Sequence, residues 1–170
     1  MKLSSVSSGS KGNCILVENK DTTVLVDVGI SKKKVEEGLS YFQQNPADID
    51  GILITHEHSD HIRGLGVFLR KYQIPVYATE KTIDYILHQA DVGKVDTDLF
   101  FPIEKNKSFY LKNLKISPLE ISHDAVDPVC YRFDEDSAAN KSCAIATDLG
   151  EITDELTHSL QELDGILVES

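Results

Sequence analysis

Short apolar runs separated by polar turns recur along the chain and predict β-strands. The polar segment ENKDTT, between the second and third of these runs, predicts a hairpin turn. The predicted strands are Lys2–Val6, Cys14–Glu18, Thr23–Val28, Gly51–Ile54, Pro75–Ala78, Leu114–Ile121, Val129–Phe133, Ser142–Ala146 and Gly165–Val168.

Between these strands, apolar residues recur at the spacing of one helix face. Ser31 is a plausible N-cap for the first such helix, which carries Val35, Leu39 and Phe42. The other apolar stripes are Ile62, Leu65, Leu69 and Tyr72; Ile83, Ile86, Leu87 and Ala90; and Ile152, Leu156, Leu160 and Leu163. This order predicts a single α/β domain over residues 1–170, with a mixed sheet or two sheets covered by helices.

The last segment, DGILVES, predicts a buried strand at which the chain stops. A domain rarely finishes on a hydrophobic strand, so we expect a chain that is truncated at its C-terminus. The alternative is a natural edge strand at the terminus.

Composition is that of an ordinary globular protein, with 41% hydrophobic and 26% charged residues. We expect no signal peptide, because the first residues contain no continuous apolar stretch, and no run is long enough to span a bilayer. The three scattered cysteines, Cys14, Cys130 and Cys143, indicate buried thiols in a reducing cytoplasm rather than a disulfide framework.

The formal net charge of −11 argues against broad, non-specific adhesion to nucleic acid or to anionic membranes. It leaves room for a locally positive site, because bound metal ions can be the largest charges in their surroundings.

The segment THEHSDH places four ligand-type side chains directly behind a predicted strand: His56, His58, Asp60 and His61. Strand alternation points His56 and His58 to the same side, and Asp60 and His61 follow at the start of a helix. Imidazole with carboxylate suits Zn²⁺, and also Mn²⁺ or Fe. The alternative, a solvated loop with chance histidines, explains this spacing less well.

Three further ligand-type residues also follow predicted strands: His123 in LEISHD, Asp148 in CAIATDLG and Asp27 in TVLVDVG. Together they could complete a metal site, which for Zn²⁺ requires about four ligands. Taken alone, His123 could be a structural histidine, and each aspartate could simply begin a turn.

The order LVDVG, THEHSDH, SHD and ATDLG resembles the metallo-β-lactamase superfamily. The stretches SSGSKGNCILVE, GILITHEHSDHIRGLGVFLRKYQIPVYA, GKVDT and SHDAVDPVCYRF further resemble the YycJ/WalJ-like branch of bacterial metallo-β-lactamase-fold hydrolases. The resemblance covers nearly the whole chain. It implies an αβ/βα sandwich, in which two mixed sheets lie between helices and the C-terminal part is missing here.

The resemblance also implies two divalent metal ions, Zn²⁺ first and Mn²⁺ as the alternative, and a role for each site residue. Asp27 would orient the histidine-rich loop, and Asp60 would carry a proton-transfer role besides being a ligand. The SGSKGN loop would lie near the site mouth, although a plain hairpin turn is an equally good interpretation. The implied ligands are His56, His58 and His123 for the first ion, Asp60 and His61 for the second, and Asp148 as a bridge between them.

One expected ligand is not found, because members of this family supply a final histidine to the second ion from a later strand. The remaining histidines, His88 and His158, fall on predicted helices among residues of the exposed face, and we interpret both as surface residues.

The function implied by the resemblance is hydrolysis by a metal-bridging hydroxide, and the branch favours exonucleolytic cleavage of DNA. Lys32, Lys33 and Lys34 form the only tight basic run, and a solvated helix face explains it better than a DNA contact does. Two alternatives remain: hydrolysis of a small ester, thioester or lactone, and a catalytically incompetent metal-binding fragment. A truncated fold would also expose an apolar sheet edge, so self-association is expected.

Overall fold

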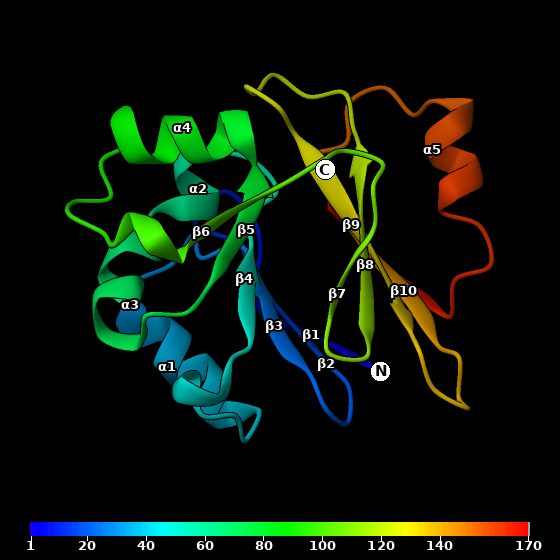
Figure 1. The fold of residues 1–170 in the computed structure, drawn as a ribbon, viewed down its shortest axis with the longest axis horizontal. Coiled ribbons are helices and arrows are strands. Elements are labelled where there is room, and N and C mark those ends of the chain that lie inside the picture. Colours follow the sequence, from blue (N-terminus) through cyan, green and yellow to red (C-terminus); the bar gives the residue numbers. More distant parts are fainter. Residues whose placement is uncertain (170) are drawn as a thin grey trace.

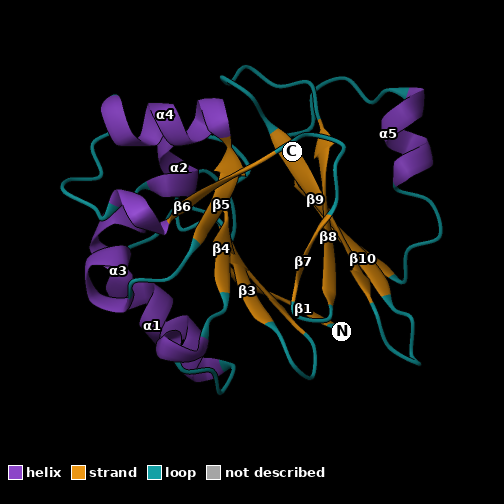
Figure 2. Ribbon diagram, viewed as in Figure 1, coloured by secondary structure: helices purple, strands orange, loops and turns teal. Residues whose placement is uncertain are grey.

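Two β-sheets lie face to face, with helices on their outer sides (Figure 1). The structure is a computed structural model in which residues 1–169 are described. Figure 2 shows α1 to α4 on the outside of the first sheet and α5 on the outside of the second. This is the predicted αβ/βα sandwich.

The first sheet has the order β1-β2-β3-β4-β5-β6. The strands β1, β2 and β3 pair antiparallel, and β3 to β6 pair parallel, as expected where helices connect successive strands. The strand bounds are β1 Lys2–Ser7, β2 Cys14–Glu18, β3 Thr23–Val26, β4 Gly51–Leu53, β5 Val76–Thr79 and β6 Phe100–Ile103.

The second sheet has the order β11-β10-β9-β8-β7. Its strands pair antiparallel from β7 to β10, and β11 pairs parallel to β10 at the edge. The strand bounds are β7 Phe109–Leu111, β8 Leu114–Glu120, β9 Val129–Glu135, β10 Ser142–Thr147 and β11 Gly165–Glu169.

Side chains cap the starts of α1 and α4. Ser31 caps α1 by accepting a hydrogen bond from the backbone N–H of Lys34, as predicted, and Thr79 caps α4 in the same way. The helix bounds are α1 Lys32–Tyr41, α2 Ser59–Ile62, α3 Leu65–Tyr72, α4 Glu80–His88 and α5 Asp154–Ser159, with 3₁₀ turns at Pro46–Asp48 and Thr97–Leu99.

The interior between the two sheets is apolar and closely packed. Side chains such as Val24 and Leu53 from the first sheet meet Ile116 and Phe133 from the second. Tyr131 is fully buried there, and its hydroxyl donates a hydrogen bond to the carbonyl oxygen of Ile54 at 2.7 Å. This bond fastens the second sheet to the segment that leads into the THEHSDH motif.

Two strands were missed from the sequence, β6 and β7. Both are short, and β6 contains Pro102, which has no N–H to donate to a strand ladder. An edge position in the sheet tolerates it. The predicted strand Thr23–Val28 ends earlier, at Val26, because Asp27 takes a left-handed conformation with φ 62°.

Two predictions near the C-terminus were wrong in part. The stripe from Ile152 to Leu163 is helical only over α5, which Thr153 caps, and Ile152 is 62% exposed. The last strand forms as β11 but is not fully buried, because its edge position leaves Ile166 and Val168 47% and 58% exposed.

Replacing Tyr131 by Phe should lower the free energy of unfolding by about 1–3 kcal/mol, because the buried carbonyl of Ile54 loses its donor. The matched control is Tyr41→Phe, at a tyrosine that is 82% exposed, with an expected change within about 0.5 kcal/mol. Equal midpoints of denaturant unfolding for the two variants would contradict this role.

Candidate metal centre

Four histidine rings from two segments of the chain pack against one another. His56, His58 and His61 follow β4, and His123 lies three residues beyond the end of β8 in the other sheet. The ring centroid of His56 lies 4.5 Å from that of His58, 4.0 Å from that of His61 and 4.8 Å from that of His123. The cluster therefore sits where the two sheets meet.

The ligand-type atoms form two groups that share His56. In each group the ligand atoms lie within 4.8 Å of one another; the groups are His56, His58 and His123, and His56, His61 and Asp148. Asp148 Oδ2 lies 2.9 Å from Nε2 of His61 and 3.8 Å from Nε2 of His56, the ring that the two groups share. Asp60 Oδ2 lies 3.6 Å from Nε2 of His61. All six predicted ligands are thus brought together.

The Asp27 carboxylate lies behind the candidate ligands and positions two of them. It acts on His56 through Thr55 and contacts His61 directly. One of its carboxylate oxygens accepts from the backbone N–H of Thr55, and the other accepts from the Thr55 hydroxyl, each at 2.8 Å. The second oxygen also lies 2.7 Å from Nδ1 of His61, and the Thr55 hydroxyl lies 3.0 Å from Nδ1 of His56. Both rings consequently turn Nε2 toward Asp148.

Asp27 and Asp148 share an unusual backbone conformation. Each directly follows a strand, β3 or β10, and each has a positive φ, 62° and 54°. Aspartate is among the few non-glycine residues that tolerate this region. Each backbone N–H then bonds to the end of the neighbouring strand, at Leu53 or Glu169. The two strand ends are therefore anchored as they turn into the site.

Thr55 and Asn13 belong to the site but were not anticipated from the sequence. Asn13 is buried in the SGSKGN loop, its backbone N–H donates to the carbonyl of Asp60, and its side-chain Nδ2 lies 3.2 Å from Nε2 of His61. The loop thus lies at the site, as the resemblance implied. The sequence offered one signal for these two residues, which is their position. Asn13 directly precedes a predicted strand, and Thr55 follows a predicted strand and begins the THEHSDH motif.

A glycine allows this loop to lie against the ligand segment. A Cβ atom on Gly29 would come within 1.7 Å of the carbonyl oxygen of Asp60, and the Gly29 N–H donates to the carbonyl of Asn13. Only glycine permits such a close approach of two backbones.

Burial and charge set the protonation of the two central histidines in opposite directions. Burial, reinforced by the neighbouring His61, His58 and His123, lowers the pKa of His56 to about 2, so its ring is neutral. Burial also acts downward on His61, but the carboxylates of Asp27, Asp60 and Asp148 outweigh it and raise its pKa to about 9. Without an ion, His61 holds a proton in the place where a cation would sit.

The residues present fit a divalent metal ion. Nε2 of His56 is buried and has no hydrogen-bond partner in residues 1–169, an arrangement that costs free energy unless something binds there. A neutral imidazole with a free Nε2 is the usual form of a metal ligand, and mixed imidazole and carboxylate donors suit Zn²⁺ or Mn²⁺.

The other histidines lie at the surface. His88 and His158 are exposed, as predicted, and His88 pairs with Asp84 one turn earlier on α4. Neither joins a group of potential metal ligands among the described residues.

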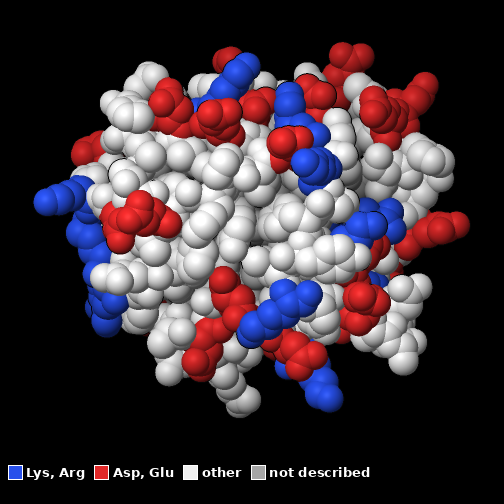
Figure 3. All heavy atoms as spheres, viewed as in Figure 1, with Lys and Arg blue, Asp and Glu red and all other residues white. Residues whose placement is uncertain are grey.

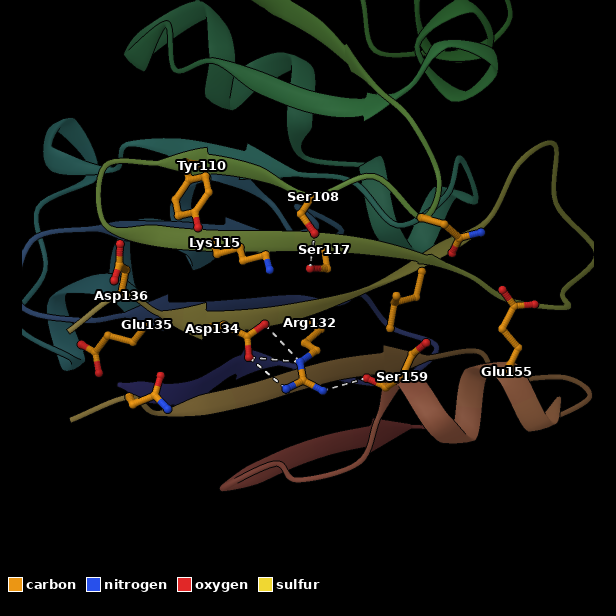
Figure 4. A pocket seen from close by; sticks show the side chains of 13 residues that line it. Ser108, Tyr110, Lys115, Ser117, Arg132, Asp134, Glu135, Asp136, Glu155 and Ser159 are labelled. Carbon is orange, nitrogen blue, oxygen red and sulfur yellow. Dashed lines mark hydrogen bonds and ion pairs between the residues drawn. The ribbon is translucent and has the colours of Figure 1, made fainter. Parts of the chain in front are cut away.

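A separate hollow of about 580 Å³ lies on the outer face of the second sheet (Figure 4). Its central side chain, Arg132, donates to the carboxylate of Asp134 and to the backbone carbonyls of Ser159 and Gln161. These contacts occupy the hydrogen-bond donors of the Arg132 guanidinium and connect the end of α5 to β9. Arg132 therefore has a structural role in this hollow.

Comparison with known proteins agrees with this fold. Residues 8–136 match the family model of the metallo-beta-lactamase superfamily, and the chain belongs to that superfamily. Within it, the chain is 40% identical over 169 residues to "Exodeoxyribonuclease WalJ" of Streptococcus pneumoniae serotype 2, and 37% identical over 172 residues to "Exodeoxyribonuclease YycJ" of Bacillus anthracis. These alignments cover 99% and 100% of the chain but 62% of each relative.

The solved structure of "Rm3 metallo-beta-lactamase" shares the fold, with a TM-score of 0.75 at 14% identity over 98% of this chain and 74% of that one. Among residues 1–169, no helix has both the length and the apolar character needed to cross a membrane.

Substituting Asp27 by Asn should weaken metal binding about 10- to 100-fold, since an amide cannot serve as an anionic acceptor for both Thr55 and His61. Metal content after dialysis against graded concentrations of Zn²⁺ measures the change. Asp136→Asn, at an exposed carboxylate, is the control. If Asp27→Asn binds Zn²⁺ as tightly as Asp136→Asn does, Asp27 has no role in supporting the metal centre.

Proposed function

We propose that this chain carries the catalytic metal centre of a phosphodiesterase that degrades DNA from an end. The observation that carries the proposal is the pair of ligand groups that share His56, with Asp148 close to both His56 and His61. In the proposed assignment, His56, His58 and His123 hold one divalent ion, Asp60 and His61 hold a second, and Asp148 bridges both.

Two such ions would supply a water of lowered pKa and polarise the phosphoryl oxygens during in-line displacement. The residues of the chain prepare the site for them. His56 is already neutral, and His61 gives up its proton when a cation takes its place. Asp27 and Thr55 keep both rings oriented without further rearrangement, which lowers the cost of binding.

Asp60 is the residue that we propose for proton transfer. Its carboxylate is partly exposed and lies beside His61 at the edge of the cluster, where a reacting group can reach it. In hydrolysis, the water oxygen bonds to phosphorus and the bond to the leaving sugar oxygen breaks. Asp60 would take the proton of the water and deliver it to the leaving oxygen.

The choice of DNA as substrate rests on the two exodeoxyribonucleases, which the chain resembles over almost its full length. The surface charge gives no further support for DNA as the substrate. Acidic and basic side chains are interspersed on the face in Figure 3, and the net charge is −11. Lys32 and Lys33 pair with Glu36 and Glu37 one turn along α1, which agrees with a solvated helix face.

This acidic surface favours a small ester, thioester or lactone as the second candidate substrate, because such molecules need no basic track. A panel of DNA, RNA and chromogenic phosphodiesters and esters separates the two. Self-association through β11, where Ile166 and Val168 are exposed, stays a prediction, as does a single domain over residues 1–170.

Replacing His58 by Ala should reduce hydrolysis of end-labelled single-stranded DNA at least about 100-fold and lower the metal content, because a ligand is lost. The control variant, His88→Ala, removes an exposed histidine and should behave as the unmodified chain does. Loss of metal with full activity would rule out a metal-dependent reaction.

Asp60→Asn separates the two proposed roles of this carboxylate. If Asp60 transfers protons, turnover should fall about 100-fold or more even where metal loading is retained, since an amide neither takes up nor releases a proton as a base or acid at neutral pH. Metal content and turnover are measured on the same preparations, together with Asp60→Ala. Full loading with undiminished turnover in both variants excludes the proton-transfer role.

A further inference from the structure

A groove of about 700 Å³ adjoins the metal centre and extends along α2 to the end of α4. His58 and Asp60 line it on the metal side, and Tyr85 and Gln89 line it on the other. A further hollow of about 330 Å³ shares Tyr85 and Gln89 and is bordered by Val126. The volume of the groove falls within the range of pockets that bind small organic ligands.

The wall of this groove contains a buried carboxylate with an unused acceptor. Glu57 is 7% exposed, and its Oε1 accepts from the backbone N–H of Val126 at 2.9 Å. Its Oε2 is buried and has no partner within residues 1–169. An unpaired buried carboxylate oxygen is costly, so a hydrogen-bond donor that reaches Glu57 would gain more here than at an exposed carboxylate.

The opposite side of the groove offers an aromatic ring and an amide. Tyr85 is half-buried on α4, and its hydroxyl makes no hydrogen bond to any described residue. The apolar side chains of Ile62 and Val92 also line the groove. The exposed Arg63 is the one arginine or lysine side chain among its lining residues. A flat ring beside apolar surface and amide groups is the setting in which a nucleobase stacks.

The charges in the groove decide which part of a nucleotide it accepts. Glu57, Asp60 and Asp91 oppose the single cation Arg63, so a run of phosphates would be repelled. A base, in contrast, carries no net charge and brings amino donors that suit Glu57 and Gln89. The phosphate would then lie toward the metal centre, next to His58.

We propose that this groove binds the unpaired base next to the scissile phosphate, with Tyr85 as the stacking platform. The inference rests on the proposed nuclease function and adds to it that the substrate is held as a single strand, since a base within a duplex is not free to stack on Tyr85.

A fluorescent reporter tests the binding directly, because the chain contains no tryptophan. The probe is a single-stranded deoxyadenosine pentanucleotide with hydrolysis-resistant phosphorothioate linkages, added to the metal-loaded chain. Tyr85→Trp should show saturable quenching. Tyr41→Trp, at the 82% exposed position on α1, should show none. No binding of the probe, or equal quenching of both reporters, overturns the proposal.

Kinetics distinguish failure of this inference from failure of the proposed function. Tyr85→Ala should raise the KM for single-stranded DNA about 10- to 100-fold and change kcat much less, and Tyr85→Phe, which keeps the ring, should restore most of the loss. Tyr41→Ala is the control. If the unmodified chain does not cleave DNA, the proposed function fails. If it does cleave DNA and Tyr85→Ala matches it, the groove assignment alone fails.

Discussion

The site depends on one buried carboxylate, that of Asp27. Through Thr55 it fixes the ring of His56, and by direct contact it fixes the ring of His61. The same carboxylate acts on His61 against the effect of burial and keeps that ring cationic when no ion is bound. Geometry and charge at the centre are therefore set by a residue whose side chain is almost completely removed from solvent.

The fold adds candidate ligands from the second sheet to those that Asp27 holds in the first. Asp27 and the THEHSDH segment follow strands β3 and β4 of the first sheet, whereas His123 and Asp148 follow β8 and β10 of the second. The apolar interior between the sheets and the hydrogen bond from Tyr131 to Ile54 hold the two sets in register. The candidate ligands are positioned by paired strands, because they follow the ends of β4, β8 and β10.

The sequence was sufficient to predict most strands and which candidate ligands lie close together, for a physical reason. His56, His58, Asp60 and His61 are close in the chain, and a strand end followed by a helix start fixes their directions. The resemblance supplied the pairing with His123 and Asp148. Thr55, Asn13 and the contact between Glu57 and Val126 were out of reach, because each depends on how segments far apart in sequence pack.

Because the candidate ligands come from both sheets, an ion bound at this centre would affect how firmly the two sheets are held together. An ion held by His58 and His123 together would act as a cross-link between the halves of the sandwich, since these residues follow strands of different sheets. Binding to the folded chain alone contributes stability in proportion to the logarithm of ion concentration above the dissociation constant. The conformational stability of the sandwich would then respond to the supply of metal in its surroundings.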